Sequence, residues 1–252
     1  MGRSGEGVAK ATEGKGLTIP AAILFDIDGT LLDDGRATFL ALRSFHAVHG
    51  EELGLSLDGL AARWRGLTQL HFARYLAGEI SMQEQRRARI QELFASSRPG
   101  LNAAEADDLF ATYLSSYRAS WTAYPDAQPT VSALSLSGVG LAVLSNGDRG
   151  QQIEKLQKCG LDTYFSEIMT SSEIGWAKPA PEAFLGACRR LGISPRRCVY
   201  VGDAMETDAC ASAAAGLIGV WLDRAGSGID PGPGVQVIHG LGEIVGIVGD
   251  AG

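Results

Sequence analysis

The stretch Ala21-Ala22-Ile23-Leu24-Phe25-Asp26-Ile27-Asp28-Gly29-Thr30 decides the fold of this 252-residue chain. Its apolar run is short, continuous and followed by turn-forming residues, which is typical of a strand buried on both faces of a parallel sheet. Asp26 and Asp28 leave the strand at positions i and i+2, so both carboxylates can face one pocket. Gly29 lets the chain turn sharply at that point.

Paired carboxylates at a strand end can divide a reaction between them. One can attack as a nucleophile while the other donates and accepts protons, provided that a cation offsets their mutual repulsion. The competing interpretation is an acidic turn that only ends the strand.

Beyond this strand the chain separates into a core and an insertion. Between residues 33 and 120 the apolar residues recur at spacings of three and four, which predicts helices and no strand. The expected helices are Ala37–His49, Leu57–Leu76, Ser81–Ser96 and Ala103–Ser120. Residues 20–32 and 121–252 are expected to form the core, and the glycine-rich residues 1–19 a disordered tail.

Strand and helix patterns alternate again after residue 138. The expected strands are Val139–Leu144, Cys198–Val201, Leu217–Leu222 and Val235–Ile238, with a strand or loop at Tyr164–Thr170. The expected helices are Gln151–Cys159, Pro181–Leu191, Asp208–Ala215 and one that begins at Leu241. Strands joined by short helices give right-handed crossovers. The predicted class is α/β, a Rossmann-like doubly wound parallel sheet with an inserted all-helical domain.

Two further clusters could carry chemistry: one contains Ser145 and Asn146, and the other contains Lys178. Ser145 and Asn146 follow a predicted strand, where a hydroxyl and backbone N–H groups suit a phosphate oxygen. Lys178 precedes Pro179 in a turn-rich stretch, and it could offer its charge to a carboxylate and a phosphoryl group together. Each cluster also has an interpretation without catalysis: the first could cap a helix, and Lys178 could lie in a solvent-facing loop.

The last cluster follows the strand Cys198–Val201 and contains Asp203 and Asp208. Carboxylate oxygens suit Mg²⁺, a hard cation that usually takes one or two of them and keeps several waters. Asp208 has a second interpretation, as the cap of the next helix. Lys155 and Lys158 are one turn apart on a predicted helix, and we expect both to be solvated.

In this order the four clusters resemble the signature of the haloacid dehalogenase-like hydrolase superfamily, over residues 21 to about 245. The helical insertion resembles that family's C1-type cap. Shorter stretches resemble its nucleotidase and N-acylneuraminate-9-phosphatase branch, namely Trp64, Gly78–Ser81, Gln85–Arg87 and Trp221–Arg224. One departure is Ala211, where the family usually has glycine and where a methyl group could crowd the helix against the sheet.

The resemblance implies a Mg²⁺-dependent phosphatase with divided roles. Asp26 would be the nucleophile that forms an aspartyl-phosphate, and Asp28 would be the general acid and base. Lys178 would neutralise Asp26 and the transferring phosphate. Mg²⁺ would be held by the side chains of Asp26 and Asp203 and by the backbone carbonyl of Asp28. Asp208 would support these ligands without contacting the ion.

The resemblance also implies how the substrate is held. Ser145 and Asn146 would bind the phosphoryl group, and the leaving group would project towards the insertion. Arg63, Trp64 and Arg65 are the candidates there for substrate specificity. The ten arginines of the insertion are balanced by eleven Asp and Glu residues, so we expect most of them to form a solvated face.

Three alternatives stay open: a haloacid dehalogenase, a phosphosugar mutase and a catalytically inactive member that serves as a binding module. Dehalogenases of this family lack an acid/base residue two positions after the nucleophile and need no Mg²⁺, so Asp28 favours a phosphatase. The intact set of Asp26, Asp28, Lys178 and Asp203 favours an enzyme over a binding module.

Composition limits the class of partner. A net charge of −7 offers no basic surface to a nucleic acid polymer, and no run approaches the roughly 18 apolar residues of a membrane span. Residues 1–16 have no apolar core of a secretory signal, and the four cysteines have no CxxC spacing, so we expect reduced thiols. The sequence predicts a cytoplasmic monomer or homodimer that acts on a small phosphorylated metabolite, such as a nucleotide or sugar phosphate.

Overall fold

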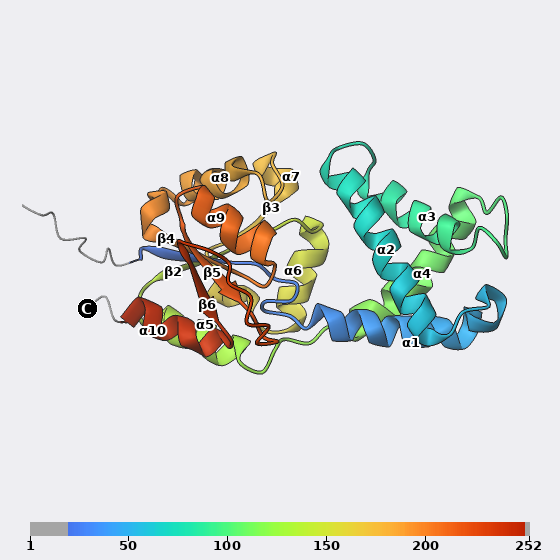
Figure 1. The fold of residues 1–252 in the computed structure, drawn as a ribbon, viewed down its shortest axis with the longest axis horizontal. Coiled ribbons are helices and arrows are strands. Elements are labelled where there is room, and N and C mark those ends of the chain that lie inside the picture. Colours follow the sequence, from blue (N-terminus) through green and yellow to red (C-terminus); the bar gives the residue numbers. More distant parts are fainter. Residues whose placement is uncertain (1–19, 250–252) are drawn as a thin grey trace, which may run out of the picture.

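The structure, a computed structural model, describes residues 20–249, so the predicted tail at 1–19 lies outside the described residues. Six parallel strands form a sheet in the order β3-β2-β1-β4-β5-β6 (Figure 1). They are β1 Ala22–Phe25, β2 Gly140–Ser145, β3 Glu167–Thr170, β4 Cys198–Gly202, β5 Ile218–Leu222 and β6 Val235–Ile238. The predicted α/β fold class is confirmed.

The helices divide into two groups. An insertion block contains α1 Asp34–Leu53, α2 Leu57–Leu76, α3 Met82–Leu93 and α4 Ala103–Ala119. The sheet is flanked by α5 Ala127–Leu136, α6 Arg149–Lys158, α7 Ser171–Ile174, α8 Pro181–Leu191, α9 Ala211–Ala214 and α10 Ile244–Gly249. Single 3-10 turns lie at Asp162–Tyr164, Pro195–Arg197 and Leu241–Glu243. No helix within residues 20–249 is long and apolar enough to cross a membrane.

The sequence analysis missed α5. Its sequence contains Pro129 and several Ser and Thr residues, which weaken a helical pattern. The proline is tolerated because it lies in the first turn, where its missing N–H would have no helical partner.

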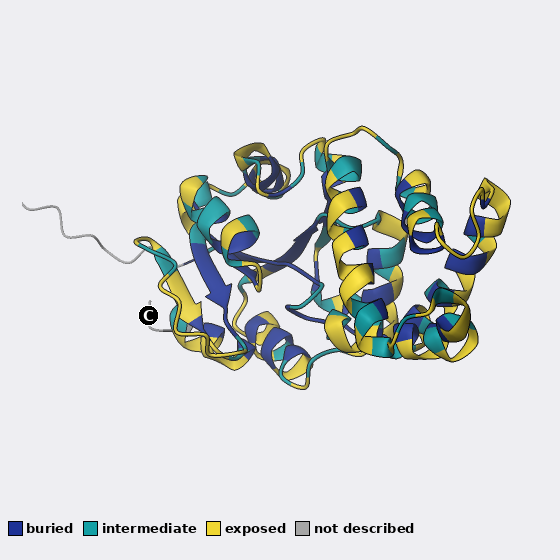
Figure 2. Ribbon diagram, turned by 45° about the vertical axis from the view of Figure 1, so that its right-hand side comes forward, coloured by how far each residue is buried: buried dark blue, intermediate teal, exposed yellow. Residues whose placement is uncertain are grey.

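Alternate residues of β1 face opposite layers of helices. Ile23 and Phe25 belong to one apolar cluster, with residues of α5 and α6, whereas Ala22 and Leu24 pack with residues of α8 on the other face. All four are at most 2% exposed. Figure 2 shows the strands buried between helices whose outer faces are exposed. Covering both faces explains why this strand is apolar at every position.

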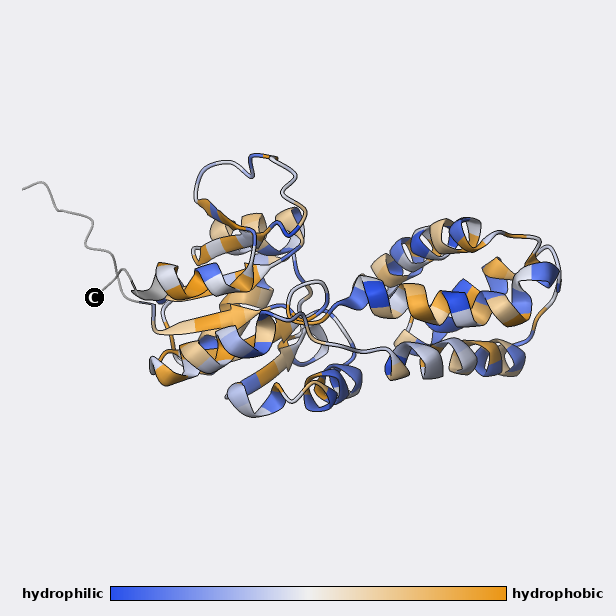
Figure 3. Cartoon of the chain, turned by 90° about the horizontal axis from the view of Figure 1, so that it is seen from below, coloured by the Kyte–Doolittle hydropathy of each residue, from blue (hydrophilic) through white to orange (hydrophobic). Residues whose placement is uncertain are grey.

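The insertion block lies beside the sheet and is joined to it by two chain segments (Figures 1 and 3). These segments run side by side: the Tyr124 N–H donates to the Leu31 carbonyl at 2.9 Å, and the Asp33 N–H donates to the Thr122 carbonyl at 3.0 Å. They place the block next to the end of the sheet at which β1 finishes.

The predicted helix Asp208–Ala215 is partly replaced by a π-helical stretch, Met205–Cys210, before α9. This stretch packs closely on β5 because Gly219 lies beneath it: a Cβ at Gly219 would clash with the carbonyl oxygen of Ala209. The methyl group of Ala211 packs against the apolar cluster on the α8 face of the sheet. The structure therefore accommodates Ala211, and the glycine that permits close packing is on the strand.

Candidate active site

The carboxyl ends of β1, β2 and β4 bring the predicted residues together. Asp26 follows β1, Ser145 ends β2, and Asp203 follows β4. Lys178 comes from the loop between α7 and α8. Because these strands are parallel neighbours, their ends lie on one edge of the sheet, where open α/β sheets bind ligands.

Lys178 lies at the centre of the cluster and is 4% exposed. Its Nζ donates to Asp26 Oδ1 at 2.8 Å, to Asp208 Oδ1 at 2.7 Å and to the Tyr200 hydroxyl at 2.7 Å. These three contacts match the three donors of an ammonium group. Burial alone would lower the pKa of Lys178, but the charges of Asp208 and Asp26 raise that pKa well above its ordinary value. Lys178 therefore stays charged beside Asp26.

Asp26, Asp203 and Asp208 form an acidic cluster, in which one carboxylate oxygen of each lies within 4.8 Å of the others. Burial raises the pKa of Asp26 to about 8, although Lys178 opposes the shift. Burial and the charge of Asp208 raise the pKa of Asp203 to about 6. Gly29 permits this approach, because it has φ +85° and a Cβ there would be 2.5 Å from Cγ of Asp203. Such crowded negative charge is typical of a cation site.

Both carboxylate oxygens of Asp208 are engaged by the protein. Oδ1 accepts from Lys178, and Oδ2 accepts from the Ala204 N–H at 3.2 Å. Asp208 is 2% exposed, whereas Asp203 lies on the solvent side of the cluster. Asp208 is thus placed to hold Lys178 in position.

Ser145 and Asn146 have different surroundings. Ser145 Oγ accepts from the Gly147 N–H at 3.2 Å and from Gln152 Nε2 at 2.8 Å, which leaves its own O–H free to donate. The Asn146 amide donates to the Lys178 carbonyl at 2.8 Å and accepts from the Lys178 N–H at 2.9 Å. Both ends of this amide therefore bond the Lys178 main chain, and the Asn146 side chain holds the Lys178 loop.

The expectation that Lys155 is solvated is wrong: it is 1% exposed, whereas Lys158 is exposed as expected. Lys155 Nζ lies 2.5 Å from Asp28 Oδ1 and 3.7 Å from Asp34 Oδ1. The Tyr117 hydroxyl donates to the same Asp34 oxygen. Lys155 is buried because two carboxylates and the rings of Tyr117 and Trp121 surround it, and it links Asp28 to both ends of the insertion block.

A cavity of about 490 Å³ lies between the insertion block and the sheet. Asp28 and Gly147 line it from the sheet, and Trp64 and Arg65 line it from α2. Arg63 is exposed and is not among the described residues that line this cavity. The structure therefore brings two of the three predicted specificity residues to the cavity.

The haloacid dehalogenase-like hydrolase family matches residues 20–216 of this sequence. The chain belongs to this family. The glyceraldehyde 3-phosphate phosphatase of Methanopyrus kandleri is 31% identical to it over 209 residues, which cover 81% of this chain and 84% of that one. The human N-acylneuraminate-9-phosphatase is 29% identical over 219 residues, 84% of this chain and 86% of the relative. The predicted family and the class of phosphoric monoester hydrolase are thereby confirmed.

Solved structures confirm the fold of this hydrolase. The HAD-hydrolase YfnB from Bacillus subtilis, bound to magnesium, has a TM-score of 0.77 with 24% identity, covering 92% of this chain and all of that one. A dehalogenase captured in an intermediate complex has a TM-score of 0.71 with 23% identity, covering 91% and 97%. At this identity the likeness extends to the fold alone.

Three residues of the hydrolase site escaped the sequence analysis: Tyr200, Gln152 and Lys155. Gln152 and Lys155 share one helical face with the buried Leu156, and this spacing was the available signal that they point inwards. Tyr200 stands in an otherwise apolar strand, where a buried hydroxyl needs a partner. The sequence could not name that partner.

Proposed function

We propose that this hydrolase releases phosphate from a small phosphomonoester by way of a phosphoryl group carried on Asp26. The observation that supports this best is the 2.8 Å contact between Asp26 and the buried Lys178 inside the acidic cluster. Phosphoryl transfer needs an in-line nucleophile and neutralisation of the phosphoryl oxygens more than elaborate covalent chemistry. A charged lysine beside a buried carboxylate supplies both.

The reaction proceeds in two balanced steps. A carboxylate oxygen of Asp26 attacks phosphorus, the bond from phosphorus to the ester oxygen breaks, and Asp28 gives that oxygen a proton. Asp28 then takes a proton from a water whose oxygen attacks the same phosphorus, and the bond from phosphorus to Asp26 breaks. The products are an alcohol and inorganic phosphate, and both aspartates return to their starting states.

The acidic cluster fits Mg²⁺, because hard carboxylate oxygens converge there and because burial, together with the charges of the neighbouring aspartates, raises the pKa of Asp26 and of Asp203. Asp26, Asp203 and the backbone carbonyl of Asp28 would hold the ion. Bound there, Mg²⁺ supplies positive charge that stabilises the phosphoryl oxygens. The free O–H of Ser145 donates to one of those oxygens.

The substrate we propose is a sugar phosphate or a short phosphorylated acid. Relatives are named for glyceraldehyde 3-phosphate, N-acylneuraminate 9-phosphate and phosphoglycolate, the last in Agrobacterium fabrum at 30% identity over 80% of both chains. The cavity of about 490 Å³ beside Asp28 has room for a leaving group of sugar size.

A dehalogenase is the second candidate, because a solved dehalogenase has the same fold as this chain. Asp28 argues against it, since a departing halide needs no proton whereas an alkoxide does. Gln152 Nε2 and Lys155 Nζ contact the two oxygens of Asp28 at 3.0 and 2.5 Å, so its carboxyl group is held in a defined orientation.

The test measures phosphate release from a panel of nucleotides, sugar phosphates and phosphorylated acids. We expect turnover with Mg²⁺, none in EDTA, and none by Asp26→Asn, because an amide cannot form the acyl-phosphate. Circular dichroism of Asp26→Asn serves as the folding control. Full activity of that variant would remove Asp26 as the nucleophile, and release of halide from 2-chloropropionate in EDTA would favour the dehalogenase.

A further inference from the structure

The insertion block contains a buried arginine with no acidic partner in the described part of the chain. Arg89 on α3 is 7% exposed and forms no ion pair among residues 20–249. Its Nη1 donates to Thr68 Oγ1 at 2.9 Å, whereas its Nε is buried and has no hydrogen-bond partner within the described residues. Burial lowers the pKa of Arg89 to about 10, which still leaves the group charged at neutral pH. An unpaired buried charge is strongly unfavourable, so an anion from outside the chain would complete this site.

The surroundings of Arg89 leave its edge for that anion. The guanidinium carbon of Arg89 lies 4.6 Å from the ring centroid of Trp64 and 5.0 Å from that of Phe110. The planes of these two rings are inclined to each other by 22°. Because the two ring centroids are only 6.2 Å apart, both rings lie on the same side of the guanidinium and do not enclose it, so they leave part of its fork of N–H donors uncovered. A fork of donors matches the paired oxygens of a carboxylate or phosphate.

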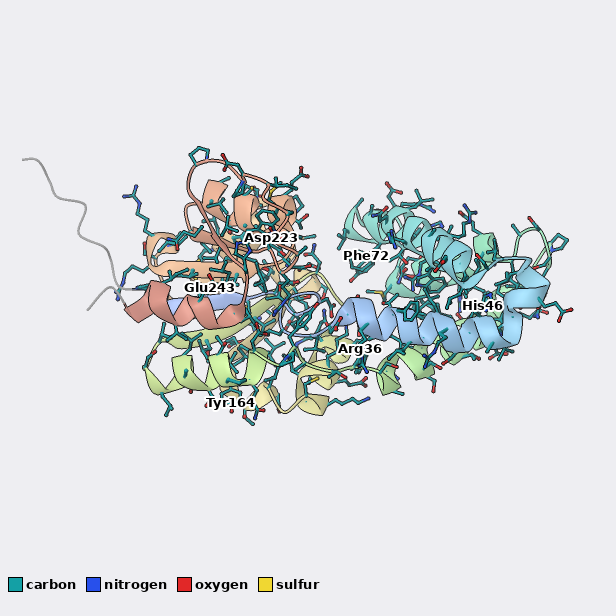
Figure 4. The ribbon with its side chains drawn as sticks, turned by 60° about the horizontal axis from the view of Figure 1, so that its bottom comes forward. Arg36, His46, Phe72, Tyr164, Asp223 and Glu243 are labelled. Atoms are coloured by element: carbon teal, nitrogen blue, oxygen red, sulfur yellow. The ribbon has the colours of Figure 1, made fainter. Side chains whose placement is uncertain are left out.

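Arg89 lines the same cavity that reaches Asp28 at the sheet. Gln85 lies one turn before it on α3 and also lines the cavity. Its buried Oε1 has no hydrogen-bond partner among the residues that the structure describes. Arg86 lines the cavity too, but its Nη2 donates to Gln151 Oε1 at 3.2 Å, so it is already engaged with α6. Phe72, another lining residue, lies at the edge of the block nearest the sheet (Figure 4).

We infer that Arg89 binds a second anionic group, a carboxylate or phosphate, on the leaving group of the substrate. Gln85 accepts a hydrogen bond from a hydroxyl beside that group. The inference rests on the proposed function, and it narrows the substrate class to phosphomonoesters of hydroxylated chains that carry another anion. The phosphoryl group meets Asp26 and Lys178 at the sheet, while the second anion is held in the insertion block.

The experiment measures binding to the Asp26→Asn protein with Mg²⁺ by isothermal titration calorimetry. One matched pair is 6-phosphogluconate and glucitol 6-phosphate, which differ by a carboxylate; the other is fructose 1,6-bisphosphate and fructose 6-phosphate, which differ by a phosphate. In at least one pair the more anionic member should bind about 30-fold more tightly or better, the lower range for a buried charge contact. Adding Arg89→Met should reduce that ratio to near one.

Arg87→Met is the matched control. Arg87 lies on the same helix, forms an ion pair with Asp107 at 2.6 Å, and is not among the described residues that line the cavity. It should keep the wild-type ratio. A preference in the first pair alone identifies a carboxylate, and one in the second alone identifies a phosphate. Equal affinities within both pairs, or a ratio that survives Arg89→Met, would overturn the inference.

Two further measurements keep the outcomes separate. Hydrolysis of 4-nitrophenyl phosphate by the wild-type protein with Mg²⁺ tests the proposed function alone, and its absence would overturn that function while the affinity ratios still decide the role of Arg89. If Arg89→Met does not fold, Arg89→Lys retains the charge without the planar fork of donors. It should lower the ratio part of the way, and an unchanged ratio would again overturn the inference.

Discussion

Replacing Lys155 by methionine tests the buried network that joins the sheet to the insertion block. Methionine retains the length and apolar contacts of the lysine stem but removes its charge. Asp28 and Asp34 would then face each other without the Nζ that now lies 2.5 and 3.7 Å from their nearest oxygens. We expect a clear loss of stability, because two neighbouring carboxylates lose their shared cation.

The size of the loss follows from burial. Removing one partner of a buried ion pair costs about 3–5 kcal/mol. The side chains of Asp28 and Asp34 are 32% and 33% exposed, so water screens part of that penalty and about 2–3 kcal/mol is expected. At about 2–4 °C per kcal/mol for a chain of this length, the Tm should fall by about 4–12 °C.

Thermal and urea unfolding followed by circular dichroism would measure this loss. Lys158→Met is the matched control on the same helix: Lys158 is exposed and donates to the carbonyls of Arg118 and Ala119 at 2.5 and 2.8 Å. Its effect should stay within about 0.5 kcal/mol. Adding Asp34→Asn to Lys155→Met should restore part of the stability. Equal Tm values for Lys155→Met and Lys158→Met would refute the reasoning.

Two other outcomes are expected. Without metal, the pKa of Asp26 near 8 and that of Asp203 near 6 exceed the ordinary value of 3.8, so between about pH 4 and 8 the folded state binds more protons than the unfolded chain. Stability must then fall as pH rises through this window. The Tm in EDTA should decrease from pH 6 to pH 8.5, and Mg²⁺ should raise the Tm more at pH 8.5; an equal Mg²⁺ shift at both pH values would contradict this assignment. Asn146→Ala removes both hydrogen bonds from the Asn146 side chain to the Lys178 main chain. Because the lysine is then displaced, kcat for 4-nitrophenyl phosphate should fall by about tenfold or more. An unchanged kcat would show that the loop holds its position without the amide.

The sequence by itself determined the sheet and the residues at its edge. The apolar run before Asp26 can be buried on both faces only in a parallel sheet, and the ends of parallel strands meet at one edge. Local pattern was therefore enough to place Asp26, Asp28, Ser145 and Asp203 together. It was also enough to separate the helical insertion, because apolar spacing differs between helices and strands.

Only the tertiary structure decided which partner each polar group takes. Lys155 and Asp28 are 127 residues apart, and Asn146 and Lys178 are 32 apart, so no local pattern connects them. A lysine on a helix with scattered apolar residues is compatible with solvent or with a buried carboxylate, and the choice depends on what packs against that face. Burial without an acidic partner is a property of three-dimensional packing alone. The sequence therefore does not distinguish Arg89 from the other nine arginines of the insertion, whereas the structure places it beside the rings of Trp64 and Phe110.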